Sequence, residues 1–513
     1  MRRSRHAPPV SISRHALLAG AILAALATGG TIGAAEVPLA GSVDATPRAI
    51  AYQTGRMADL RSPRLGGVVR TVQNCNDSGS GSLREAYLAS GDGDTVDLGQ
   101  LTCSTITLTS GELQSNGVVA YVAINGNRYT HTTIDANLAG RAFQHAAGRL
   151  RLSYLEVRRG RVHDAAGGGC VRSFGDVVLA GSEVSDCEVS TSGTTPARGG
   201  AIQADGVVFL SDSIVSGNRA TAASADADGG GVHARYVIGA HGCTVSGNTA
   251  SGDGTHHARG GGLHGREGVR LDECTLTDNR AISGGGAYVG DASFYNSSFT
   301  NVTISGNEAL GAGGGVFSWF DVRFDNSTVT ANRAVFDFGA GVYLAGGSAT
   351  MRSTIVAGNT SGDGLVESDV GGHPGAVVDG GHNLVRASTR PLPPDTLSSD
   401  PMLGPLQDNG GQVWTHALLP GSPAIDAGDN PRSLWTDARQ YACSDSGCVQ
   451  YERTLGAGTD IGAFELGGPD RIFDDGFDRE ARAADRPGPR RDGDALPRWM
   501  EPASAAPHQL QHA

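Results

Sequence analysis

Aspartate and histidine side chains in the middle of the chain are the residues whose types and spacing could do chemistry. The candidates for catalysis are Asp228, His233, His257 and His264, and the candidates for metal ligation are Asp226, Asp228, Asp253 and His256. Carboxylates together with imidazoles could hold a cation such as calcium or act as general acids and bases. Because exposed loops rich in Asp, Gly and His are usually only solvated, we favour loops without chemistry and expect no cofactor.

A second set of side chains lies just after the glycine-rich corners. Each corner is followed by an apolar residue, and the next residue is a member of this set. Its members are Gln203, His233, His264, Tyr288, Phe317 and Tyr343, and the apolar neighbours are Ile202, Val232, Leu263, Ala287, Val316 and Val342. Because adjacent residues of a strand point to opposite faces, the apolar neighbours should face the interior and the set should face outward. An exposed aromatic stripe could bind sugar rings by stacking. The alternative, which we favour, is a side-chain stack covered by corner loops.

The elements that position these residues belong to a sequence repeat. An asparagine recurs every 25 to 31 residues, with an aliphatic residue three positions before it, a small residue five before it and a polar residue between. This alternation predicts a strand with one buried face. The asparagine ends the strand, and its amide could bond to the equivalent amide of the next copy. The predicted ladder contains Asn218, Asn248, Asn279, Asn307, Asn332 and Asn359, with Cys187 in the first copy.

A repeat of this length is typical of stacked coils, none of which can bury its apolar face alone. Glycine supplies 77 of the 513 residues, and its clusters suit sharp corners. One strand after each glycine corner, one in the middle and one before the asparagine give three strands per coil. We therefore predict an all-β parallel β-helix of roughly ten coils and about 50 Å, with parallel pairing between coils.

Two motifs resemble known families of bacterial surface β-helices. Gly199-Gly200-Ala201-Ile202 resembles the signature of polymorphic outer-membrane-protein repeats, which implies a right-handed parallel β-helix. Residues 71–98, with Ser82-Leu83-Arg84-Glu85-Ala86, resemble a CSLREA-type domain, which implies a helical N-terminal cap. Ser82 as N-cap, with Glu85 three residues later, fits the start of a helix.

The C-terminal part carries two further resemblances. Residues 400–430 and 459–466 are similar to the choice-of-anchor Q domain of bacterial surface proteins, which implies a small β-rich domain without catalytic residues. Residues 470–478, DRIFDDGFD, are similar to a C-terminal motif of exported bacterial proteins.

The N-terminus has the features of an export signal. Four arginines precede an apolar run from Ala16 to Ala27, and the small residues Gly33-Ala34-Ala35 follow. No later run reaches about 18 apolar residues, so we expect a mature chain without a transmembrane segment, outside the cell or on its outer surface. The predicted organisation is a signal peptide (1–35), a flexible linker (36–64), a cap with the first coils (65–148), β-helix repeats (149–382), a choice-of-anchor Q-like domain (383–467) and a disordered tail (468–513).

Eight cysteines in an exported chain could form disulfides. Cys75 and Cys103 flank the predicted cap and are the best pair, and Cys443 with Cys448 could close a small loop. Cys243 and Cys274 occupy the same repeat position one coil apart, where a disulfide and two stacked thiols fit equally well. The pairing of Cys170 and Cys187 stays open.

Composition excludes several classes of function. All 40 basic residues are arginine, which removes lysine bases, Schiff bases and P-loop lysines. The formal charge of −13 argues against nucleic acid as a partner. We find no signature of pectate lyases, polygalacturonases or pectin esterases. We therefore predict a monomeric, non-catalytic adhesin or binding scaffold for polysaccharides or cell-surface glycans. The alternatives are a carbohydrate-active enzyme of the pectin-lyase-like fold (a polysaccharide lyase or glycoside hydrolase) and a structural envelope component.

Overall fold

The computed structural model describes residues 66–467, apart from residues 118–119, 164–166, 291–296, 337–338, 363 and 445–446. The predicted signal peptide, the linker and the tail with its DRIFDDGFD motif lie outside the described residues. Among the described residues, no helix combines the length and the hydropathy that crossing a membrane requires.

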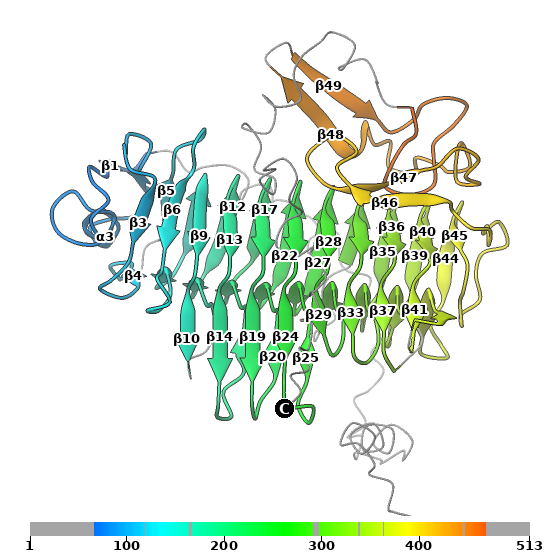
Figure 1. Ribbon diagram of the computed structural model, residues 1–513, viewed down its shortest axis with the longest axis horizontal. Helices are drawn as coiled ribbons and strands as arrows, with labels where there is room; N and C mark the ends of the chain where they lie inside the picture. Colours follow the sequence, from blue (N-terminus) through cyan, green and yellow to red (C-terminus); the bar gives the residue numbers. More distant parts are fainter. Residues whose placement is uncertain are drawn as a thin grey trace, which may run out of the picture. The chain divides into compact units, whose positions relative to one another are not determined.

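Stacked coils of short strands make up most of the structure (Figure 1). A middle coil contains β11 (Val171–Ser173), β12 (Asp176–Ala180), β13 (Glu183–Ser185) and β14 (Glu188–Thr191). Each of these strands pairs in parallel with its counterpart in the next coil. The predicted all-β parallel β-helix is therefore confirmed, but the middle coils contain four or five strands instead of the predicted three.

Two of the sheets run almost the full length of the β-helix. Sheet A has 12 strands: β1 (Val69–Thr71), β2 (Asp94–Asp97), β5 (Tyr121–Asn125), β8 (Arg149–Ser153), β12, β17 (Val208–Ser211), β22 (Val237–His241), β27 (Gly268–Asp272), β31 (Ser297–Thr300), β35 (Val322–Asp325), β39 (Ala349–Arg352) and β44 (Val378–Gly381). Sheet B has 11: β3 (Thr105–Thr107), β6 (Thr132–Asp135), β9 (Leu155–Arg158), β13, β18 (Ile214–Ser216), β23 (Thr244–Ser246), β28 (Thr275–Thr277), β32 (Thr303–Ser305), β36 (Thr328–Thr330), β40 (Ile355–Ala357) and β45 (Leu384–Val385).

The remaining sheets of the β-helix are shorter. Sheet C has 10 strands: β4 (Leu113–Gln114), β7 (Phe143–His145), β11, β16 (Ile202–Ala204), β21 (Val232–Ala234), β26 (Leu263–Gly265), β30 (Ala287–Val289), β34 (Val316–Ser318), β38 (Val342–Leu344) and β43 (Val370–Gly372). Sheet D has nine: β10 (Arg161–His163), β14, β19 (Arg219–Ala222), β24 (Thr249–Ser251), β29 (Arg280–Ala281), β33 (Glu308–Ala309), β37 (Arg333–Ala334), β41 (Thr360–Ser361) and the antiparallel β42 (Val366–Glu367). Sheet E has three: β15 (Ala197–Arg198), β20 (Ala227–Asp228) and β25 (Ala258–Arg259).

The asparagine column runs inside the turn that follows each sheet B strand. Nδ2 of Asn248 donates to Oδ1 of Asn279 at 2.9 Å, and the same bond joins every neighbouring pair from Asn218 to Asn359. Each asparagine also donates through its backbone N–H to the next Oδ1. At the far end, Asp369 takes the place of the next asparagine and accepts from both nitrogens of Asn359.

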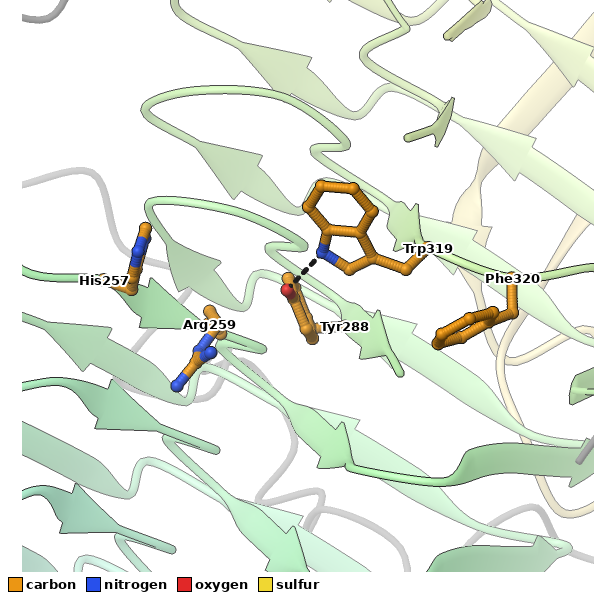
Figure 2. Close-up of a pocket in the computed structure, with 5 residues that line it drawn as sticks. All are labelled: His257, Arg259, Tyr288, Trp319 and Phe320. Atoms are coloured by element: carbon orange, nitrogen blue, oxygen red, sulfur yellow. Dashed lines mark hydrogen bonds between the residues drawn. The ribbon is translucent and has the colours of Figure 1, made fainter. Parts of the chain in front are cut away.

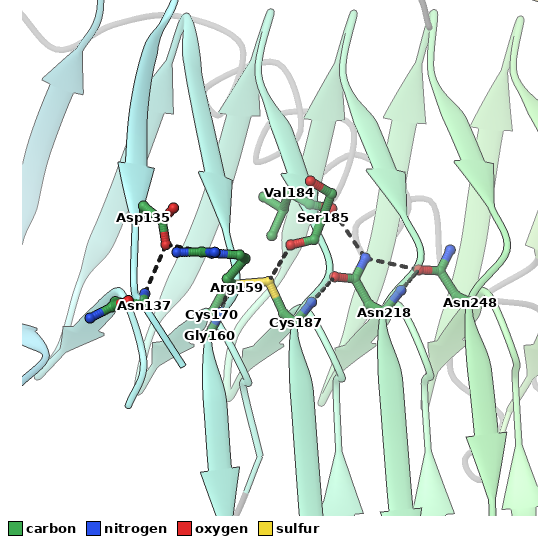
Figure 3. The surroundings of a disulfide bond; sticks show 10 residues. All are labelled: Asp135, Asn137, Arg159, Gly160, Cys170, Val184, Ser185, Cys187, Asn218 and Asn248. Carbon is green, nitrogen blue, oxygen red and sulfur yellow. Dashed lines mark hydrogen bonds and ion pairs between the residues drawn. A yellow bond between two sulfur atoms is a disulfide. The ribbon is translucent and has the colours of Figure 1, made fainter. Parts of the chain in front are cut away.

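A disulfide between Cys170 and Cys187 begins this column (Figure 3). Both cysteines are buried, and the backbone N–H of Cys187 donates to Oδ1 of Asn218 at 2.9 Å. Cys187 therefore replaces the first ladder asparagine and links its own turn to the preceding glycine corner. Cys243 and Cys274, in contrast, are free buried thiols in adjacent coils.

The segment with the predicted cap contains one short helix, α3 (Leu83–Leu88). Ser82 accepts from the backbone N–H of Glu85, as an N-cap does, and Leu83 and Tyr87 are buried. A helical cap is not supported, however: α3 lies in the chain between β1 and β2, within the first coil. A disulfide joins Cys75 to Cys103 nearby.

The C-terminal part contains two antiparallel strand pairs, β46 (Leu403–Gln407) with β47 (Thr415–Leu418) and β48 (Thr436–Ser444) with β49 (Gly447–Glu452). Their residues bond to sheet B and its turns: His416 Nε2 lies 2.9 Å from Ser305 Oγ, and Thr436 Oγ1 donates to Glu273 Oε1 at 2.8 Å. The register of the second pair sets Cys443 opposite Cys448.

Candidate functional site

The set predicted to face outward lies in one column of sheet C. Backbone register aligns Gln203, His233, His264, Tyr288, Phe317 and Tyr343 across six successive coils. Neighbouring rings are in contact. The centroids of His233 and His264 are 5.2 Å apart and those of His264 and Tyr288 are 5.0 Å apart, both edge to face, whereas Tyr288 and Phe317 stack with centroids 5.1 Å apart. The first five members are buried and Tyr343 is half-buried, so the column is the covered stack that we favoured and not an exposed stripe.

Sheet E provides the polar groups beside the two histidines of this stack. Asp228, in β20, is only 1% exposed, and Oδ1 of its carboxylate accepts from Arg259 Nε at 2.7 Å. The same oxygen lies 3.5 Å from His264 Nδ1. Arg259, in β25, also donates to the second carboxylate oxygen of Asp228 at 3.1 Å and to Asp226 at 2.9 Å. A carboxylate, two imidazoles and a guanidinium are thus brought together from two adjacent coils.

Burial and neighbouring charges together decide the charge states in this cluster. Burial lowers the pKa of His233 well below its usual range, and the neighbouring His264 lowers it further, so the His233 imidazole is neutral. Burial alone would raise the pKa of the Asp228 carboxyl. His264 and the always-charged Arg259 outweigh that effect and hold this pKa below its usual range, so Asp228 is ionised.

The predicted metal ligands separate into two pairs. Asp226 and Asp228 both bond to Arg259. Asp253 and His256 contact each other within the next corner loop, with His256 Nδ1 3.2 Å from Asp253 Oδ1. The donors that come together are instead Asp228, His233 and His264, whose ligand atoms all lie within 4.8 Å of one another. Periodicity predicted that both histidines lie on one face, and Asp228, grouped with them as a candidate in the sequence analysis, lies beside them in the structure.

An open pocket of about 400 Å³ lies beside this cluster (Figure 2). The residues that line it are His257, Arg259, Tyr288, Trp319 and Phe320. Trp319 Nε1 donates to the Tyr288 hydroxyl at 2.6 Å, and the Trp319 side chain is still 46% exposed. The guanidinium carbon of Arg259 lies 5.7 Å from the centre of the Tyr288 ring.

The sequence analysis missed Trp319 and Phe320. Trp319 follows Phe317 by two residues, so the period of two that placed Phe317 on this face also places Trp319 there. The rings of Phe317 and Trp319 are 5.9 Å apart, in agreement with that placement.

Corner length explains why the pocket opens at this coil. Twelve positions separate Asn248 from Gly260, and this long corner supplies β25 of sheet E. Only five positions separate Asn279 from Gly284, and the structure has no further sheet E strand among the described residues of that coil. Sheet E therefore covers His233 and His264, whereas Tyr288 and Phe317 are buried without a sheet E strand in the part of the chain that the structure describes, and Tyr288 borders the pocket.

Comparisons with known proteins add little to this site. No family model matches the chain, and no curated protein matches it. One similar solved structure is titled as the crystal structure of pectate lyase Pel9A, with 14% sequence identity and a TM-score of 0.42, over 80% of this chain and 99% of that one. The resemblances to polymorphic outer-membrane-protein repeats, CSLREA-type domains and choice-of-anchor Q domains stay predictions.

Proposed function

We propose that the protein is an exported bacterial β-helix scaffold, outside the cell or on its surface, that binds a polysaccharide without cleaving it. The observation that carries the proposal is the pocket around Trp319. An exposed indole held in place by the Tyr288 hydroxyl presents a rigid apolar face, and His257 and Arg259 supply polar groups at the rim. Aromatic faces with a few polar neighbours are well suited to sugar rings, which have apolar faces and polar edges.

Electrostatics favours a sugar without charge in this pocket. Arg259 is the cation of the rim, but its guanidinium already pairs with Asp226 at 2.9 Å and with Asp228 at 2.7 Å. Two carboxylates thus neutralise the charge that would otherwise attract a uronic acid. We therefore infer that neutral sugar units occupy the pocket, with the pyranose face against Trp319.

Other exposed aromatic residues lie at the same corner of the β-helix, between sheets C and A. Phe174, Tyr236 and Trp319 follow β11, β21 and β34, and their side chains are 52%, 38% and 46% exposed. Two coils separate the first pair and three coils the second, or about 10 and 15 Å at the usual strand spacing. An extended polysaccharide that runs along the β-helix would contact all three, so affinity should rise with oligosaccharide length.

The buried cluster argues against cleavage at this site. Asp228 is 1% exposed, His233 is 3% exposed and His264 is 0% exposed, so these candidate acids and bases cannot reach a polymer in the pocket. General acid–base catalysis requires hydrogen-bond contact with the reacting atoms. His257 is the catalytic candidate that lines the pocket, and the described residues of the pocket lining include no carboxylate to act with it. The alternative function, a polysaccharide lyase or glycoside hydrolase, would therefore need the buried cluster to open.

Two disulfides support the export part of the proposal. The bonds Cys75–Cys103 and Cys170–Cys187 are of a kind that persists in oxidising surroundings such as the periplasm or the cell exterior.

The test is a polysaccharide panel against the full chain, with binding followed by calorimetry and new chain ends followed over hours with and without calcium. We expect binding of at least one neutral polysaccharide without product. Trp319→Ala should weaken it about tenfold, since loss of one aromatic contact and its buried area amounts to about 1.4 kcal/mol. Trp435→Ala is the matched control, because Trp435 is 82% exposed but lies in the C-terminal part, at the start of β48.

Three results would contradict the proposal in different ways. If Trp319→Ala and Trp435→Ala bind the polysaccharide with equal affinity, the polysaccharide binds at a surface other than this pocket. Products that disappear in Asp228→Asn would establish the enzyme alternative. If no glycan binds at all, the structural envelope role becomes the better interpretation.

A further inference from the structure

The cluster beneath the pocket has the composition of a metal site. His233 and His264 are register partners in β21 and β26, and Asp228 comes from β20 of the neighbouring sheet E. One ligand atom from each lies within 4.8 Å of the other two. All three side chains are at most 3% exposed, so the arrangement is held by packing on every side.

His233 is the strongest indication that something else binds here. Its side chain is 3% exposed, and neither Nδ1 nor Nε2 has a hydrogen-bond partner. A buried polar atom without a partner destabilises a fold, because it has lost its bonds to water and gained none. The ring meets His264 edge to face, at 85° between the ring planes, with the two centroids 5.2 Å apart.

Stacking alone does not explain a histidine at this position. The same column continues with Tyr288 and Phe317, whose rings are 5.1 Å apart and stack without a buried nitrogen. A phenylalanine at residue 233 would fill the same space without unsatisfied polar atoms. We therefore attribute the presence of a histidine at residue 233 to its ring nitrogens, which can bind a ligand.

We propose that Asp228, His233 and His264 bind a divalent transition-metal cation of the zinc type. Two imidazoles and one carboxylate suit zinc, cobalt or nickel, whereas calcium and magnesium prefer all-oxygen sites. Arg259 would serve as the outer partner that orients the carboxylate, since ligating carboxylates are themselves usually hydrogen-bonded.

Binding requires a small contraction of the cluster. Ligand atoms of a tetrahedral zinc site lie about 3.3 Å apart at bond lengths of about 2.0 Å, against a span of up to 4.8 Å here. Rotation of the His233 ring and its neighbours would close this gap. Arg259 both lines the pocket and bonds to Asp228, so it stands at the entry from the pocket side.

The test is a titration of the metal-stripped full chain with Co²⁺, read by its visible absorption, and with Zn²⁺, read by calorimetry. We expect one tightly bound ion per chain, with tetrahedral cobalt bands and a rise in Tm with zinc. Asp228→Asn and His264→Gln should each weaken binding at least tenfold. His256→Gln and His257→Gln, outside the cluster, should leave it unchanged.

His233→Phe keeps the test decisive if the other variants fold poorly, because it continues the ring stack. It should fold, lose the bound ion and lose the zinc-dependent rise in Tm. Absence of a stoichiometric ion in the wild-type chain would overturn the proposal, as would full binding by His233→Phe. Glycan binding is measured in a separate experiment, so a chain that binds no glycan would leave the test of metal binding unaffected.

Discussion

Replacement of Asn279 by alanine is the sharpest test of how the β-helix is held together. Asn279 is fully buried in the middle of the asparagine column. Its Oδ1 accepts from the backbone N–H and from Nδ2 of Asn248, at 3.0 and 2.9 Å. Its Nδ2 donates to the Val245 carbonyl and to Asn307 Oδ1, both at 2.9 Å. Alanine removes all four bonds.

The expected loss follows from these contacts. Each bond contributes about 1 kcal/mol net, so four of them amount to about 4 kcal/mol. Alanine also leaves the Asn248 N–H buried without its partner, which prevents the loss from being much smaller. We expect the free energy of unfolding to fall by about 3–5 kcal/mol.

Asn218→Ala provides an internal comparison. Because Cys187 precedes it in the column, the Asn218 side chain forms three such bonds, one to the Cys187 N–H and two through Nδ2. Its loss should be about 1 kcal/mol smaller than that of Asn279→Ala. Asn76→Ala, at an exposed site, should change the stability by less than about 0.5 kcal/mol.

The assay is urea unfolding of the full chain, followed by far-UV circular dichroism, with the shift in midpoint converted through the common slope. A loss below about 1 kcal/mol for Asn279→Ala would refute the reasoning, because the column would then contribute no more than an ordinary surface residue. Equal losses at Asn279 and Asn218 would refute the count of bonds.

Two further predictions concern the ends of the same column. Burial raises the pKa of Asp369 to about 6, so its contribution to stability is full below about pH 4 and is lost as the pH rises through about 6. The free energy of unfolding of the wild-type chain should therefore fall by up to about 3 kcal/mol between pH 4 and 7 through this group, and Asp369→Asn should lack that fall. The measurement is a series of urea unfolding curves over this pH range. The same pH dependence in the variant and the wild type would contradict the raised pKa of Asp369. Loss of the Cys170–Cys187 bond, 17 residues apart, in the double alanine variant should lower the free energy of unfolding by about 3 kcal/mol, and equal midpoints for variant and wild type without reductant would be inconsistent with a disulfide there.

Much of the fold could be predicted because the repeat encodes it locally. The aliphatic residue three positions before each asparagine identifies a strand and its buried face, and the intervals identify stacked coils. Val184, Val215 and Val245, predicted as interior residues, are all 0% exposed and lie in register. Handedness stays a prediction from resemblance.

Features that break the repeat could not be predicted. Asp369 follows Asn359 by only ten residues, instead of the usual interval, so no periodic search would find the last member of the column. Cys170 and Cys187 pair within one coil, between a glycine corner and an asparagine turn, where equivalent positions of other coils hold no cysteine. Sheet D was missed because the asparagine was taken as the end of a strand, whereas β19 and β24 begin directly after Asn218 and Asn248.

The candidate site depends on corner length more than on the residues of the column. Period-two alternation tells which face His233, His264 and Tyr288 occupy, but not what covers that face. Long corners add β20 and β25, which bring Asp228 and Arg259 over the two histidines and bury a polar cluster. The following coils have short corners without a sheet E strand among the described residues, and there the buried Tyr288 borders an open aromatic pocket. Arg259 belongs to both, since it bonds to Asp228 and lines the pocket, so an ion held beneath it would also fix one wall of the proposed glycan site.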